Sequence, residues 1–138
     1  MQVFIIGTPL ETARVLDNKR LNKQIIECGQ ILDAINGKKA WSNHPCTLQY
    51  KEYSSWLEAY MNCLKNYRLG NGKAKTYNDI AMTIKPHFHT EEYFNQMKRR
   101  LYTKDNEYYN QWKELGTSNE NWYYVNNKWI KYINGKKI

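Results

Sequence analysis

Four polar residues near the start of the chain have a spacing that could support chemistry on a phosphorylated ligand. Arg20, Lys23, Gln24 and Glu27 recur at i, i+3, i+4 and i+7, so on a helix they share one face. The cations on such a face could hold phosphate groups while the carboxylate acts on a sugar or a base. A solvated helix face with ion pairs has the same spacing, so the pattern alone leaves both interpretations open.

A histidine and a basic cluster could add contacts to an anion. His44 precedes Pro45 at an expected helix start, where backbone N–H groups and the helix dipole favour anions. A neutral imidazole there could donate to a phosphate or sugar oxygen, or only cap the helix. Lys98, Arg99 and Arg100 form a basic cluster that could contact backbone phosphates or simply form a charged surface.

The remaining candidate ligands do not suggest a metal centre. His87 and His89 would face one side of a strand, but no further ligands stand at a recognised spacing. Cys28, Cys46 and Cys63 are odd in number and scattered, which fits a reducing cytosol better than a disulfide framework. We therefore expect no metal and no cofactor.

Charge and composition favour an anionic partner. The 138 residues include 21 Lys and Arg against 13 Asp and Glu, a net charge of +8, and 14% are aromatic. This combination favours nucleic acid or a nucleotide as the partner, although abundant lysine also serves solubility. No apolar run is long enough to span a membrane and no signal peptide is recognisable, so we expect a cytoplasmic protein.

Apolar periodicity predicts the helices that position these residues. After a buried extended segment at 2–7, a helix is expected over about 12–36, broken near Asp17 and ended by Gly37. The further helices are expected from near Asn43 to Gly70, over 76–84, from Thr90 to about Tyr102, and from Asp105 to Leu115. In the last of these helices, the side chains of Tyr108, Trp112 and Leu115 are expected to point inward.

The chain changes character after about residue 120. Two alternating runs flank Asn126-Asn127, and Asn134-Gly135 precedes the last residues, which predicts a small hairpin or meander. Its aromatic residues, interleaved with lysines, could stack on bases or pack on the helices. The fold class expected is mainly α: a compact single domain over 1–138, with a helical core over 1–115 and an aromatic, basic, β-like tail over 120–138.

Three segments together resemble the pyrimidine-dimer DNA glycosylase family, which includes phage endonuclease V and small phage and bacterial relatives. The resemblance extends over about residues 1–115 and is greatest to those small relatives. The segments are Met1-Gln2-Val3-Phe4, then Leu16-Asp17-Asn18-Lys19-Arg20-Leu21-x-Lys23-Gln24-x-x-Glu27 with Ile31-Leu32, and Trp41-x-Asn43-His44-Pro45.

The resemblance implies a DNA glycosylase with AP-lyase activity that needs no metal or organic cofactor. In that family the N-terminal α-amine attacks C1′ of a damaged nucleotide, expels the base and forms a Schiff base, and β-elimination then nicks the strand. A glutamate assists, and it aligns with Glu27; the family's histidine falls near His44. The catalytic residues implied are therefore Met1 and Glu27, and the implied partner is damaged duplex DNA.

Two departures from the family keep a second function open. Gln2 is bulky, so we expect Met1 to be retained and to supply the amine. Ile26 and Gln30 occupy the positions of two phosphate-binding arginines, so either Arg20 and Lys23 compensate or catalysis is lost.

The alternative is a non-enzymatic phage protein in the host cytoplasm that sequesters a nucleotide or cyclic nucleotide signal. A third, more general interpretation is a DNA- or RNA-binding module that uses the aromatic tail. The sequence leaves the oligomeric state open.

Overall fold

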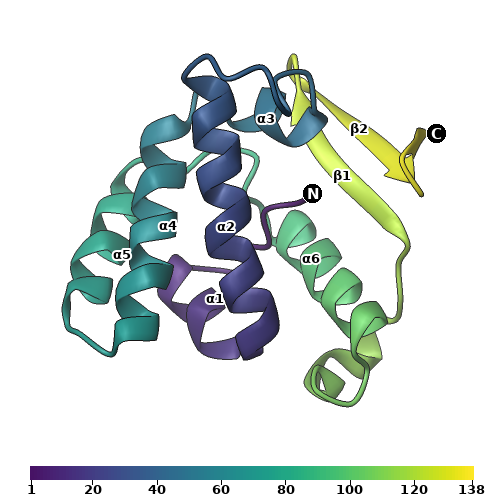
Figure 1. Ribbon diagram of the computed structural model, residues 1–138. Coiled ribbons are helices and arrows are strands. Elements are labelled where there is room, and N and C mark those ends of the chain that lie inside the picture. The colour runs from purple at the N-terminus through teal and green to yellow at the C-terminus, as the bar shows by residue number, and fades with distance from the viewer.

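The first residues enter the protein as an extended, buried segment. In the computed structural model, which describes residues 1–138, Val3 and Ile5 are fully buried and Gln2 is nearly so. This confirms the expected extended segment. Figure 1 shows the N-terminus lying between α2 and β1, near the middle of the molecule.

The expected first helix is two helices, α1 (Pro9–Val15) and α2 (Asn18–Ile35). Thr8 and Glu11 form a capping box that begins α1. Asp17 occupies the position before α2, but its side chain makes no capping hydrogen bond there. Gly37 follows α2 with a φ of 106°, a left-handed conformation that suits glycine and ends the helix.

The helix expected from Asn43 to Gly70 is also divided in two. The parts are α3 (Pro45–Tyr50) and α4 (Ser54–Leu69), and Tyr53 between them has non-helical angles. α4 packs against α2 on one side and against α5 (Lys73–Thr83) on the other. Figure 1 shows α4 and α5 as an antiparallel pair beside α2.

The segment after α6 (Glu91–Lys104) differs from the expectation. Asp105 is followed by turns and a short 3-10 helix, η1 (Asn110–Leu115), rather than by a regular helix. The prediction that Tyr108 points inward is wrong: Tyr108 is exposed and Tyr109 is buried. The reason is that the Tyr109 hydroxyl donates a hydrogen bond to the Asp17 carboxylate, which directs that ring into the protein.

The C-terminal tail is the small sheet that its alternation predicts. β1 (Glu120–Val125), β2 (Lys128–Ile133) and β3 (Lys136–Lys137) form an antiparallel sheet in sequence order. Asn126 and Asn127 both have positive φ, as a two-residue type I′ turn requires. β1 packs against α3 and α6, so the sheet covers one side of the helices.

The mainly helical fold class with a small C-terminal sheet is therefore confirmed. Stacked aromatic rings fill its centre, since Trp56 stacks on both Tyr50 and Tyr60, with interplanar angles of 14° and 10°. No helix has the length and apolarity that would let it cross a membrane.

Candidate functional site

The polar face predicted on α2 lines a small cavity of about 130 Å³. The structure therefore brings four of the predicted site residues together, and it adds a lysine from the end of α6 that the sequence analysis missed. The lining residues are Phe4, Lys19, Arg20, Lys23, Gln24, Glu27 and Lys104.

Arg20 is held in a fixed orientation beside this cavity. Its Nη1 donates to both carboxylate oxygens of Asp17, at 3.2 and 3.3 Å, and its guanidinium lies 6.0 Å from the centre of the Tyr109 ring. Burial would raise the pKa of Asp17, but the hydrogen bonds from Tyr109 and Arg20 outweigh it and lower that pKa. Because Arg20 uses only Nη1 within the chain, its other N–H groups remain available to a ligand.

Lys104 completes a group of cations around one carboxylate. Partial desolvation of its ammonium group, followed by the positive charges of Arg100, Lys23 and Arg20, lowers the pKa of Lys104, and Glu27 opposes this effect. The charges are therefore close enough to influence one another. An anion placed among them would relieve their mutual repulsion, which is the electrostatic requirement of a phosphate site.

Gln24 ties the N-terminal segment to α2. Its Nε2 donates to the carbonyl of Gln2 at 3.0 Å, and its Oε1 accepts from the N–H of Phe4. The Tyr60 hydroxyl donates to the carbonyl of Phe4 on the same segment. Gln24 thus lines the cavity while its amide serves mainly to hold the backbone that leads to Met1.

The Met1 amine lies near His44. Burial, and then the positive charge of that amine, lowers the pKa of His44, so its imidazole is neutral over a wider range of pH. His44 Nδ1 accepts a hydrogen bond from the N–H of Cys46 at 3.1 Å. The capping interpretation of His44 is therefore correct, and the neutral ring carries its proton on Nε2, where it can be donated.

The Met1 amine and Glu27 also share a buried neighbour. Burial raises the pKa of the Cys46 thiol to about 12; the charge of the amine acts against this increase, and the charge of Glu27 adds to it. Cys46 is fully buried. The charges of both groups therefore act on the same buried thiol.

The basic cluster on α6 lies outside the cavity. Arg99 Nε donates to the carbonyl of Leu115 at 2.9 Å, and Arg100 donates to Asn121 Oδ1 and to the carbonyl of Ser118, both at 3.0 Å. Lys98 lies over the ring of Trp112. These contacts join α6 to the segment that leads into β1, so none of the three cations lines the cavity, although the charge of Arg100 acts on Lys104.

The two residues that depart from the family pattern do not line the cavity. Ile26 is 61% exposed and Gln30 is also exposed, and neither lines it. The cations available to the cavity are instead supplied by Lys19, Arg20, Lys23 and Lys104.

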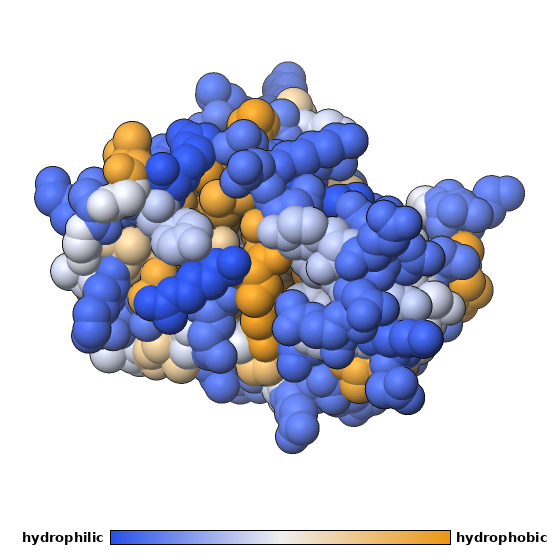
Figure 2. Space-filling view, turned by 90° about the horizontal axis from the view of Figure 1, so that it is seen from below, coloured by the Kyte–Doolittle hydropathy of each residue, from blue (hydrophilic) through white to orange (hydrophobic).

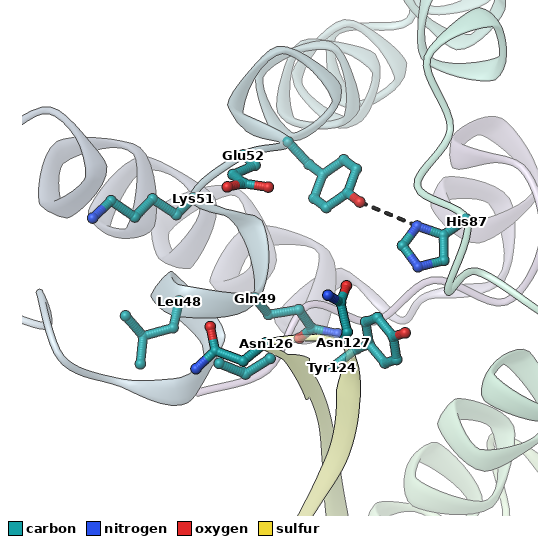
Figure 3. A pocket seen from close by; sticks show the side chains of 10 residues that line it. Leu48, Gln49, Lys51, Glu52, His87, Tyr124, Asn126 and Asn127 are labelled. Atoms are coloured by element: carbon teal, nitrogen blue, oxygen red, sulfur yellow. Dashed lines mark hydrogen bonds between the residues drawn. The ribbon is translucent and has the colours of Figure 1, made fainter.

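The largest cavity, of about 560 Å³, lies elsewhere and contains none of the predicted site residues. Figure 3 shows it between the end of α3, the loop that carries His87 and the turn at Asn126-Asn127. His87 Nδ1 is 3.1 Å from the Tyr53 hydroxyl there. Its size is that of a ligand pocket, but its lining carries both a lysine and a glutamate and offers no cluster of cations.

The two histidines of the His87–His89 pair do not share a site. His89 is buried, its Nε2 lies 2.9 Å from the Tyr50 hydroxyl, and burial lowers its pKa to about 3. His87 is exposed. The segment is a loop rather than a strand, and no group of three or more histidine, cysteine, aspartate or glutamate residues is arranged to hold a metal ion.

Comparison with known proteins supports the resemblance seen in the residues. Residues 1–67 match the family model described as pyrimidine dimer DNA glycosylase. Searches of the curated proteins and of the solved structures gave no match. The matched segment contains Met1, Gln24, Glu27 and His44. Gln24 and Glu27 lie in α2, Gln24 holds the segment that carries Met1, and the charge of the Met1 amine acts on His44. Residues 1–67, just under half of the 138 residues, are thus similar to the pyrimidine dimer DNA glycosylase family.

Proposed function

We propose that this protein is a DNA glycosylase with AP-lyase activity that acts on damaged pyrimidines through the α-amine of Met1, assisted by Glu27. The family match supports glycosylase activity, and the family implies binding to damaged DNA. One observation supports the mechanism most directly. Gln24 fixes the N-terminal segment along α2, one turn before Glu27, so the amine and the carboxylate are held by the same helix.

The reaction begins with the neutral amine as nucleophile. Its nitrogen bonds to C1′ of the deoxyribose, and the glycosidic bond breaks with its electron pair leaving on the base, which takes up a proton. The C1′–O4′ bond then opens, O4′ is protonated, and a C1′=N iminium forms. Removal of a proton from C2′ expels the 3′ phosphate by breaking the C3′–O bond, and water hydrolyses the imine to restore the amine.

The residues around the amine suit these steps. Glu27 can stabilise the cationic sugar and the iminium, and can pass a proton to O4′. Arg20, Lys23 and Lys104 can bind the phosphates next to the damaged nucleotide. His44 can donate its Nε2 proton to a sugar or phosphate oxygen near the amine.

Borohydride trapping tests the proposal, because reduction of the imine leaves a stable protein–DNA adduct. Duplexes that contain a pyrimidine dimer or an abasic site are expected to give an adduct whose DNA is attached at Met1, as peptide mass spectrometry would show. Glu27→Gln is expected to slow strand nicking about 100-fold or more, in the range typical of a proton-transferring group. Glu58→Gln, an exposed change on α4, is the matched control.

The absence of any adduct, together with unchanged nicking by Glu27→Gln, would exclude this mechanism. An intact-mass measurement must accompany the assay, because a formylated or acetylated Met1 could not form an imine. If Met1 carries such a group in the active protein, the proposal is also wrong.

One observation favours a second function. The cations of α2 and α6 surround a cavity of only about 130 Å³, which suits a single phosphate group better than a long groove for DNA. A protein that sequesters a nucleotide or cyclic nucleotide would need no reactive amine. Calorimetric binding of such a nucleotide, with no trapped adduct on any damaged duplex, would favour this function over the glycosylase.

A further inference from the structure

The C-terminal sheet reaches back to the N-terminal residue. The hydroxyl of Tyr123, in β1, donates a hydrogen bond to the carbonyl of Met1 at 2.8 Å. The neighbouring carbonyl, that of Trp122, accepts from Gln2 Nε2 at 3.5 Å. β1 lies outside residues 1–67, so this contact comes from a part of the chain that the family match does not include.

Tyr123 is itself held firmly. It is 3% exposed and belongs to the buried core. Its ring meets the rings of His44 and Tyr132 edge to face, with centres 5.9 and 5.7 Å apart. Burial raises the pKa of the Tyr123 phenol far above neutrality, so the hydroxyl keeps its proton and remains a donor.

The hydrogen bond restricts the amine through the first peptide group. Tyr123 fixes the oxygen of the Met1–Gln2 peptide plane, and Gln24 fixes the oxygen of the next one. Since a peptide group is planar, the Met1 amine then retains little freedom beyond the rotation about its own Cα–C bond. The same tyrosine packs on His44, the imidazole whose charge is influenced by that amine.

We propose that Tyr123 is a positioning residue that directs the Met1 amine toward the sugar carbon. This inference rests on the proposed function, because it concerns the nucleophile of that reaction. Tyr123 need not touch the DNA, and it acts through the Met1 carbonyl. Loss of the hydroxyl should therefore slow imine formation and leave the affinity for DNA almost unchanged. A displacement of about 1 Å at a reacting group can cost about 100-fold in rate, so a decrease of about 10- to 100-fold is expected.

The test compares Tyr123→Phe with Tyr132→Phe. Both changes delete one hydroxyl from the same sheet, but that of Tyr132 makes no hydrogen bond within the chain and its ring packs against Tyr123. Each variant is mixed in excess with an abasic-site duplex, and the single-turnover rate of borohydride trapping is measured beside the dissociation constant for the same duplex. We expect Tyr123→Phe to reduce the trapping rate about 10- to 100-fold with less than a 2-fold change in the dissociation constant, and Tyr132→Phe to match the unmodified protein.

A spectroscopic measurement separates positioning from general loss of structure. With ¹³C at the Met1 carbonyl, Tyr123→Phe should move that resonance upfield, while Tyr132→Phe should leave it in place. The inference is overturned if Tyr123→Phe traps DNA at the normal rate, or if its rate and its DNA affinity fall together. It is equally overturned if the carbonyl resonance does not move. If the unmodified protein forms no adduct with DNA, the proposed function is wrong and this inference is wrong with it. If the unmodified protein and Tyr123→Phe both form the adduct at the same rate, only the role of Tyr123 is excluded.

Discussion

Replacing the buried Gln24 with alanine should destabilise the protein far more than the same substitution at Gln30, an exposed position in the same helix. Gln24 is 2% exposed, and its amide provides the partner for the Gln2 carbonyl and for the Phe4 N–H. Alanine would leave both backbone groups without a partner, since they lie in a buried segment. The Tyr60 hydroxyl would still serve the Phe4 carbonyl.

The size of the effect follows from these two groups. A buried backbone group that loses its partner costs about 1–3 kcal/mol, so two such groups cost about 4 kcal/mol in the free energy of unfolding. Alanine recovers only a few tenths of a kcal/mol through its higher helix propensity. With a urea dependence of about 2 kcal/mol per molar, the unfolding midpoint should fall by about 2 M.

Gln30→Ala is the matched control, because Gln30 lies in the same helix and its side chain is exposed. Its effect should stay within about 0.5 kcal/mol. Urea unfolding followed by tryptophan fluorescence measures both variants. If Gln24→Ala lowers the stability by less than about 1 kcal/mol, or if the two variants unfold alike, Gln24 does not fix the N-terminal segment and does not hold the amine near Glu27.

Three further changes test other parts of the structure. Asp17→Asn should lower the free energy of unfolding by about 2 kcal/mol at pH 7, since a charged hydrogen-bond acceptor is lost. Folding lowers the pKa of Asp17, so its stabilising effect is lost as the carboxylate is protonated. The difference in urea midpoint between the variant and the unmodified protein should therefore shrink as the pH falls below about 4. Burial lowers the pKa of His89 to about 3, so below about pH 6.5 the unfolded state binds a proton that the folded state does not bind. The free energy of unfolding should therefore fall by about 1.4 kcal/mol for each unit by which the pH is lowered. His89→Gln should remove this contribution to the pH dependence of unfolding, and an unchanged pH dependence would show that His89 is not its source. In titrations with duplex DNA, Lys104→Gln should reduce the slope of log binding constant against log salt concentration by about 1. Lys136→Gln, at an exposed position in β3, should leave that slope unchanged. If both variants give the same slope, Lys104 does not contact the DNA.

Local signals in the sequence were sufficient for most of the secondary structure. The apolar stripe of α2, the helix end at Gly37 and the turn between β1 and β2 at Asn126-Asn127 all depend on residues that are close together in the sequence. The inward position of the Tyr109 ring could not be predicted from its neighbours, because it depends on Asp17, a residue 92 positions away. No periodicity in the sequence carries that information.

The candidate site was predictable to the same extent. The common face of Arg20, Lys23, Gln24 and Glu27 follows from helical spacing alone, and the cavity confirms that these residues lie together. Lys104 could not be assigned from the sequence, because its place depends on how α6 packs beside α2. The spacing also could not show that Arg99 and Arg100 use their side chains on carbonyls that precede β1.

The contact between Tyr123 and Met1 has a consequence for the order in which the protein is made. A ribosome adds about 5–20 residues per second, and the two partners are separated by 122 positions, so the N-terminal residue emerges well before the strand that restrains it exists. During that interval the amine is open to the enzymes that deformylate or trim nascent chains. Once β1 has formed, the hydrogen bond closes over the Met1 carbonyl. A chain truncated before Tyr123 would lack this hydrogen bond, and its N-terminal segment would be held only by Gln24 and Tyr60.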